Sequence, residues 1–165
     1  MKKLIVLLFM LLPVGAFSQE VKIAVVNFGE VFNMMPELDE AQTKFATFRA
    51  QYENDLKALQ DEYTVKYEEY MKTQETLPEN LKLRRQQDIN AIQERFQNLM
   101  SLYQEDSEQE YAKLMAPIQE KLQKTIEAVG QEQGYTVIIP TTALLYVGNS
   151  AIDATPLLKA KLGLK

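Results

Sequence analysis

The chain has 165 residues and a formal net charge of −5, and it contains neither cysteine nor histidine. Its length suits one folded unit, and its acidic balance argues against nucleic-acid binding, which needs a concentrated basic surface. Without Cys and His the chain has no disulfide framework, thiolate or imidazole catalyst, or ordinary zinc or copper site. We therefore expect no enzyme, no catalytic residue, no metal and no cofactor.

Residues 1–18 have the organisation of a secretory signal peptide. Two lysines precede the apolar run 4–12, and the small residues Ala16 and Ser18 follow it in an A-x-S cleavage pattern. The apolar run is too short to cross a bilayer, which needs roughly 20 apolar residues. We therefore expect a processed periplasmic protein, whose formal charge changes from −5 to −7 when the two lysines are removed.

A short β-branched run opens the next segment, residues 19–36. Ile23 to Val26 form this run, and Asn27 and Gly29 end it. The pattern predicts a core strand that is buried on both faces.

Two long helical patterns follow Pro36. Apolar and aromatic residues recur there at steps of three or four, which predicts an outgoing helix over residues 37–77. Pro78 interrupts the pattern, and the turn and a returning helix are predicted over 78–133. At about 1.5 Å per residue each helix would be roughly 60 Å long, so the pair is expected to project as an arm.

The last segment, residues 134–165, predicts two strands and a short helix. The strands are expected over 135–139 and 143–147, and the helix is expected to start with Thr155 as N-cap and Pro156 as its first residue. The predicted fold class is α+β: a long, coiled-coil-like antiparallel helical hairpin inserted into a small β-rich oligomerisation body.

This body has only about fifty residues, which is too few to form a stable hydrophobic core that also supports a long helical arm. Self-association would close its exposed strand edges, so we expect a homo-oligomer. The residues predicted to hold the copies together are Ile23, Val25, Val137, Ile139, Leu145 and Val147. The alternative is a monomeric three-stranded sheet that the roots of the arm helices cover.

Large side chains on the arm are the candidate binding residues. At this spacing such residues ordinarily form the seam between two helices, but a two-helix arm cannot hide them all, and exposed rings make adaptable contacts. The candidates are Phe45, Phe48, Tyr52, Tyr63, Tyr67, Tyr70, Met71, Leu77, Leu81, Leu83, Phe96 and Tyr103.

A small basic cluster, Lys82, Arg84 and Arg85, lies near the predicted tip of the arm. It could contact anionic partners or lipid headgroups. The alternative is that these residues and the neighbouring acids simply keep the helix soluble, so we expect at most weak contact with a membrane surface.

Five segments carry a resemblance to a known family. They are residues 22–28 with Val31 and Phe32 after them, then 114–118, 134–139, 144–146 and 153–155. Their order around a long polar hairpin resembles the Skp/OmpH family of periplasmic chaperones.

The resemblance implies a function as well as a fold. It implies that three chains share a β-rich body and that three arms enclose a cavity for unfolded outer-membrane proteins, without use of ATP. Well-known members are basic with strongly basic arms, whereas this chain is acidic and its tip is balanced, so the resemblance leaves lipopolysaccharide binding and the electrostatic part of client attraction open. The sequence leaves one other function open, a structural coiled-coil adaptor or spacer of the cell envelope that docks a fixed folded partner.

Overall fold

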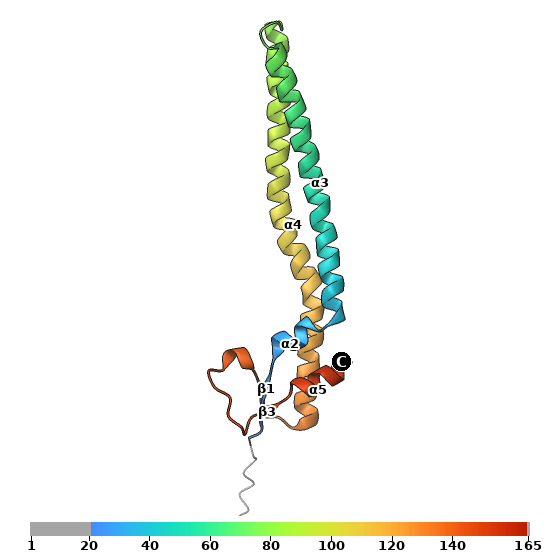
Figure 1. Ribbon diagram of the computed structural model, residues 1–165, viewed down its shortest axis with the longest axis vertical. Coiled ribbons are helices and arrows are strands. Elements are labelled where there is room, and N and C mark those ends of the chain that lie inside the picture. Colours follow the sequence, from blue (N-terminus) through green and yellow to red (C-terminus); the bar gives the residue numbers. More distant parts are fainter. Residues whose placement is uncertain (1–20, 165) are drawn as a thin grey trace, which may run out of the picture.

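The computed structural model describes residues 21–164 and shows a long two-helix arm that rises from a small body (Figure 1). The predicted signal peptide, residues 1–18, lies outside the described residues. The elements in chain order are β1 (Ile23–Val26), α2 (Phe28–Asn33), α3 (Pro36–Thr73), α4 (Glu79–Gln133), β2 (Val137–Pro140), a 3-10 turn (Thr141–Ala143), β3 (Ile152–Asp153) and α5 (Thr155–Leu162). No helix within residues 21–164 is both long and apolar enough to cross a membrane.

The body contains a three-stranded parallel sheet in the order β2-β1-β3. Ile23 of β1 lies opposite Val137 of β2, and Ala24 lies opposite Ile152 of β3. The prediction of a buried strand is confirmed for three of its four residues, because Ala24, Val25 and Val26 are at most 5% exposed. β1 is central, and this position explains the continuous apolar run in its sequence.

The strand predicted over residues 143–147 is wrong, and the third strand is β3 instead. In the described chain, Leu145 and Tyr146 are 108% and 83% exposed. β2 and β3 occupy both edges of β1, and within residues 21–164 the apolar run pairs with neither of these outer strands.

The arm consists of α3, with 38 residues, and α4, with 55. The turn between them is held by the carbonyl of Thr73, which accepts hydrogen bonds from the N–H groups of Thr76 and Leu77 at 3.0 and 3.2 Å. Pro78 follows as the N-cap residue of α4, where its missing N–H costs nothing. Gly134 ends α4 with φ of 66°, a left-handed conformation that glycine adopts without steric cost.

The start of α5 differs from its prediction. Thr155 is the first helical residue rather than the N-cap, and its hydroxyl accepts a hydrogen bond from the Asn27 N–H at 2.9 Å. The N-cap residue is Ala154, and the carboxylate of Asp153 just before it accepts a hydrogen bond from the N–H of Thr155, also at 2.9 Å. Thr155 is therefore used to join α5 to the end of β1.

One hydrophobic core joins the body to the root of the arm. It contains Ala24 and Val26 of β1, Ala41 of α3, Met115 and Leu122 of α4, and Leu158 of α5, together with Val31, Met35, Leu38, Ile118, Val129 and Ala154. Ion pairs from Lys121 to Glu37, Lys159 to Glu30 and Lys161 to Glu132 lie around it. The last part of α4, from Met115 onward, thus belongs to the body, and the arm continues it as one helix.

Candidate functional site

Aromatic rings fill the seam of the arm near the body. Phe45 meets Tyr111 edge-on with ring centroids 5.5 Å apart, and Tyr52 meets Tyr103 at 5.0 Å. Phe48 packs against both Tyr52 and Tyr103, at 5.1 and 6.3 Å. Each such pair contributes about 0.5–1.5 kcal/mol beyond simple burial. In this part of the arm the predicted aromatic residues therefore hold α3 to α4, while their outer edges stay accessible.

A hydrogen bond fastens this stack. The Tyr52 hydroxyl donates to the Asp106 carboxylate at 2.5 Å. The same hydrogen bond raises the pKa of Tyr52, because ionising the phenol would remove the proton that is shared.

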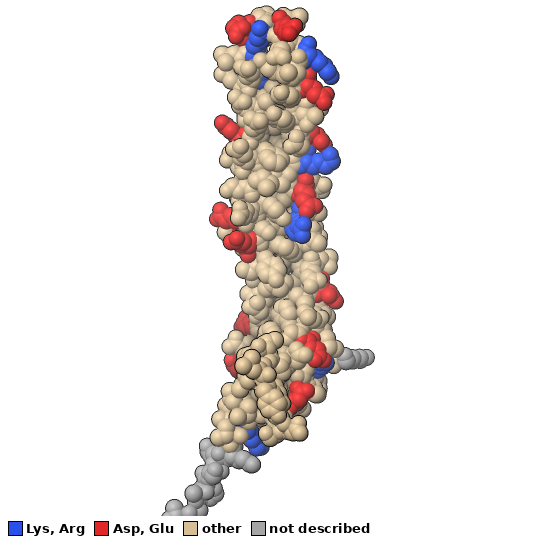
Figure 2. All heavy atoms as spheres, turned by 60° about the vertical axis from the view of Figure 1, so that its left-hand side comes forward, with Lys and Arg blue, Asp and Glu red and all other residues tan. Residues whose placement is uncertain are grey.

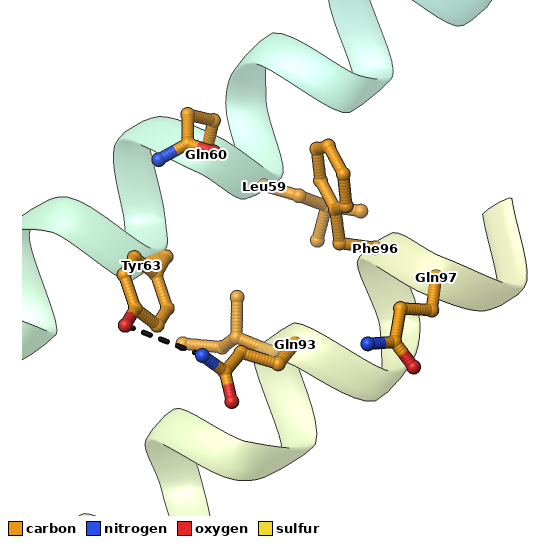
Figure 3. Close-up of a pocket in the computed structure, with 7 residues that line it drawn as sticks. Leu59, Gln60, Tyr63, Gln93, Phe96 and Gln97 are labelled. Carbon is orange, nitrogen blue, oxygen red and sulfur yellow. Dashed lines mark hydrogen bonds between the residues drawn. The ribbon is translucent and has the colours of Figure 1, made fainter. Parts of the chain in front are cut away.

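The middle of the arm is packed less completely than its base. Leu59 and Ile92 are 8% and 3% exposed and form a narrow apolar seam. On one side of this seam lies a hollow of about 330 Å³ (Figure 3). Its lining is Leu59, Gln60, Tyr63, Ile92, Gln93, Phe96 and Gln97, without a charged residue.

Figure 3 shows how the lining is arranged. Leu59 and Phe96 lie together on one side of the hollow, and on the other side the amide of Gln93 donates to the Tyr63 hydroxyl at 3.2 Å. Gln60 and Gln97 stand at its edge on α3 and α4. The hollow therefore combines an apolar floor with a rim of neutral hydrogen-bonding groups.

A second hollow, of about 540 Å³, lies on the other side of the same seam. Its lining is Asp55, Ala58, Leu59, Glu62, Arg95, Asn98, Leu99 and Leu102. Arg95 forms an ion pair with Glu62 at 3.4 Å across it. At this level of the arm, the side with the first hollow is uncharged, whereas the side with the second hollow carries charged residues.

Several predicted arm residues reach solvent towards the tip. Tyr67, Met71, Leu81 and Leu83 are 43%, 46%, 41% and 56% exposed. The other predicted arm residues, Phe45, Phe48, Tyr52, Tyr63, Tyr70, Leu77, Phe96 and Tyr103, are half-buried. The candidates are therefore divided between seam and surface.

Three exposed apolar residues were not predicted. They are Val65, Met100 and Leu102, which are 65%, 45% and 48% exposed. They lie off the main apolar stripe, so their only signal in the sequence was an apolar residue at a position where the helical period predicts a surface residue.

The basic cluster is largely neutralised by its neighbours. Lys82 lies 3.7 Å from Glu79, and Arg85 lies 3.3 Å from Glu69. Exposed pairs of this kind contribute little to stability, but they reduce the positive potential at the tip.

The body also presents apolar surface. Ile23, Val137, Leu145 and Val147 are 44%, 42%, 108% and 41% exposed, and Ile139 is half-buried. Val25, by contrast, is only 5% exposed and is already covered within its own chain.

Comparison with known proteins decides the family. The family model described as outer membrane protein (OmpH-like) matches residues 22–162. The chain belongs to this family. The predicted resemblance is thus confirmed over almost all the described residues.

Individual OmpH-like relatives agree with the family model. A chaperone protein Skp from Pectobacterium atrosepticum is 22% identical over 84% of each chain, and one from Photorhabdus laumondii is 23% identical over 88% of each chain. A crystal structure described as an OmpH-like outer membrane chaperone, from Caulobacter crescentus, superposes with a TM-score of 0.75 at 16% identity, covering 86% of this chain and 83% of that one. The family and its relatives confirm the prediction of a chaperone rather than an enzyme, and the structural match confirms the fold.

Proposed function

We propose that this chain is an ATP-independent holdase of the periplasm, which binds unfolded outer-membrane proteins within a cavity formed by the arms of a homotrimer. The observation that carries the proposal is the exposure of large apolar side chains along an arm too thin to bury them. Relatives named chaperone protein Skp support it. The predicted signal peptide supports export to the periplasm.

Each contact with a client is expected to be weak. A few hundred Å² of apolar contact yields several kcal/mol at roughly 25 cal/mol per Å², before the costs of ordering are subtracted. Several arms that engage one client raise the effective concentration of every further contact. Capture can then be tight while single contacts exchange rapidly, and release needs no nucleotide.

The body supports the oligomeric part of the proposal. The segment with Leu145 and Tyr146 carries two exposed apolar side chains and pairs with no strand within residues 21–164. The outer edge of β2 is likewise unpaired within residues 21–164. Association of several bodies would cover both features.

A structural adaptor is not favoured as the function. Docking one fixed folded partner ordinarily uses a compact patch, in which a cluster of large side chains is surrounded by a polar rim. The exposed apolar residues of this arm are instead spread along both helices, among Glu, Gln and Lys. Dispersed contacts suit a client without a fixed shape.

The proposal is tested by aggregation. A urea-unfolded outer-membrane barrel is diluted without ATP, and light scattering is followed with increasing amounts of the processed protein. We expect suppression at about one trimer per barrel, with three arms engaging each client. Persistent scattering at large excess would contradict the proposal.

A pair of variants locates the activity on the arm. Combining Tyr67→Ser, Met71→Gln and Leu83→Gln should weaken suppression, because all three side chains are exposed near the tip. The control is Leu157→Gln in the body, where the side chain is 37% exposed. Equal activity of the triple variant and the control would show that the arm surface does not bind clients.

A further inference from the structure

The two broad faces of the arm differ in charge. On one face, Gln60, Tyr63 and Tyr67 follow one another in α3 at steps of three and four, and Gln93, Gln97 and Met100 do so in α4. Such spacing places residues on one face of a helix. Four of the six line the same hollow, so both sets lie on the same side of the hairpin. We call these six residues the neutral face.

The opposite face is charged. Asp55, Glu62 and Glu69 repeat there at steps of seven, and Arg95 pairs with Glu62. Figure 2, in which the α4 side of Figure 1 comes forward, shows a band without charged side chains running up the arm. Acidic residues flank this band on one edge, and acidic and basic residues together flank it on the other.

We propose that the neutral face is the client-facing side of the arm, and that its hollow seats an aromatic side chain of an extended, uncharged segment of the client. The proposal rests on the proposed function and assigns that function to one side of the hairpin. It excludes the charged face, including the second hollow, as the primary contact.

The first argument is the cost of desolvation. A client that covered Asp55, or the paired Glu62 and Arg95, would remove charges from water, and an ion pair repays this desolvation cost only in part. Covering glutamine and tyrosine costs much less. Their amide and hydroxyl groups can also exchange hydrogen bonds with water for hydrogen bonds with the client.

The second argument is chemical complementarity with the client. A transmembrane β-strand alternates apolar and polar residues and carries aromatic girdles at its ends. When such a strand is unfolded, its backbone N–H and C=O groups need partners. The floor of Leu59, Ile92 and Phe96 suits an aromatic ring, and the amides of Gln60 and Gln97 offer both donors and acceptors to the neighbouring peptide groups.

The third argument is size and adaptability. The hollow of about 330 Å³ falls at the small end of known ligand pockets, which suits one side chain rather than a folded surface. Met100 and Tyr67 extend the face beyond the hollow and are 45% and 43% exposed. Flexible thioethers and amphipathic rings accommodate many sequences.

The composition of the chain allows a direct test, because it has no cysteine and no tryptophan. Bimane is attached to Gln97→Cys in one variant and to the adjacent Asn98→Cys in another. Both positions are exposed, but Gln97 lines the neutral hollow and Asn98 lines the charged one. The probe is a urea-unfolded outer-membrane barrel that contains tryptophan, which quenches bimane on contact.

We expect the barrel to quench bimane at position 97 at least about twofold, with little change at position 98, because only the first label lies beside the seated ring. Equal quenching, stronger quenching at position 98, or binding without quenching at either position would overturn the assignment of the face. Anisotropy of the barrel is read in parallel. If the barrel does not bind at all, the proposed function itself fails.

A charge series provides the second test. The double variant Gln60→Glu with Gln97→Glu adds two nearly isosteric charges to the neutral face. The control, Asn54→Asp with Asn98→Asp, adds the same net charge at Asn98, which lines the charged hollow, and at the exposed Asn54, which is not part of the neutral face. We expect the first to weaken barrel binding about 3–10-fold and the control less than about 2-fold. Equal losses would overturn the proposal.

Discussion

Replacing Leu145 by Asp should convert the proposed homotrimer into monomers. The Leu145 side chain is 108% exposed in the single chain and contacts none of the core, so the substitution should leave the fold intact. Any effect on mass must then arise at a contact between copies.

The magnitude follows from burial. Fully burying one leucine side chain contributes about 1.5–3 kcal/mol, and three copies in a trimer together contribute about 5–9 kcal/mol. Since each 1.4 kcal/mol is tenfold, the association constant should fall by at least about a thousandfold. A buried aspartate would add a desolvation cost to that loss.

The assay is multi-angle light scattering of the processed protein at micromolar concentration. We expect a trimer mass for the parent protein and a monomer mass for Leu145→Asp, with identical helix content by circular dichroism. The control is Leu102→Asp on the arm, where the side chain is 48% exposed and the body is distant. A parent protein that is already monomeric, or a variant that keeps the trimer mass on dilution, would refute the reasoning.

Three further predictions concern stability. Leu122→Ala should lower the free energy of unfolding by about 3–5 kcal/mol in urea titrations, whereas Leu122→Met should cost less than about 1.5 kcal/mol, because Leu122 is 0% exposed in the core. The hydrogen bond from Lys121 lowers the pKa of Glu37 from its ordinary 4.5, so this contribution is present above pH 4.5 and lost as pH falls through the folded-state pKa. Glu37→Gln should therefore remove part of the acid dependence of the melting temperature, and an unchanged acid profile would contradict this. Tyr52 is the opposite case: its hydrogen bond to Asp106 raises its pKa above 10.0, so the bond stabilises below that pH and is lost as pH rises through the folded-state pKa. The melting temperature of Tyr52→Phe should therefore lack this decrease at alkaline pH. The same decrease in the variant would contradict the reasoning.

The arm could be predicted from sequence because its signal is long and periodic. Apolar residues at steps of three or four recur from Leu38 through Val129, and the segment around Pro78 and the polar Ser107 interrupt them. β1 was predictable for a related reason: a central parallel strand is buried on both faces and is therefore continuously apolar.

The remaining body elements were not predictable in the same way. β3 has two residues, one of them the charged Asp153, and its pairing depends on which edge of β1 is free. The helix α2 has six residues and includes Gly29, a poor helix former. The run 143–147 has the composition of a strand, but composition does not show whether a partner edge exists.

The candidate site was predicted in part. The sequence places the tyrosines on one apolar stripe, but it does not show that Tyr52 is held by Asp106 in the seam while Tyr67 remains 43% exposed. That difference depends on the crossing of α3 and α4. The hollow beside Leu59 depends on the same geometry, since it arises where the side chains of facing helices fail to meet.

The parallel pairing of β1 with β2 makes this protein a demanding one to fold. Ile23 and its partner Val137 are separated by the entire hairpin, so their contact has very high sequence separation. Loop closure over so long a flexible chain is slow, but a helical hairpin forms by local steps and returns its two ends to the same place. β1 can therefore pair with β2 only after the complete hairpin is available, and the packing of α3 against α4 brings β2 to the edge of β1.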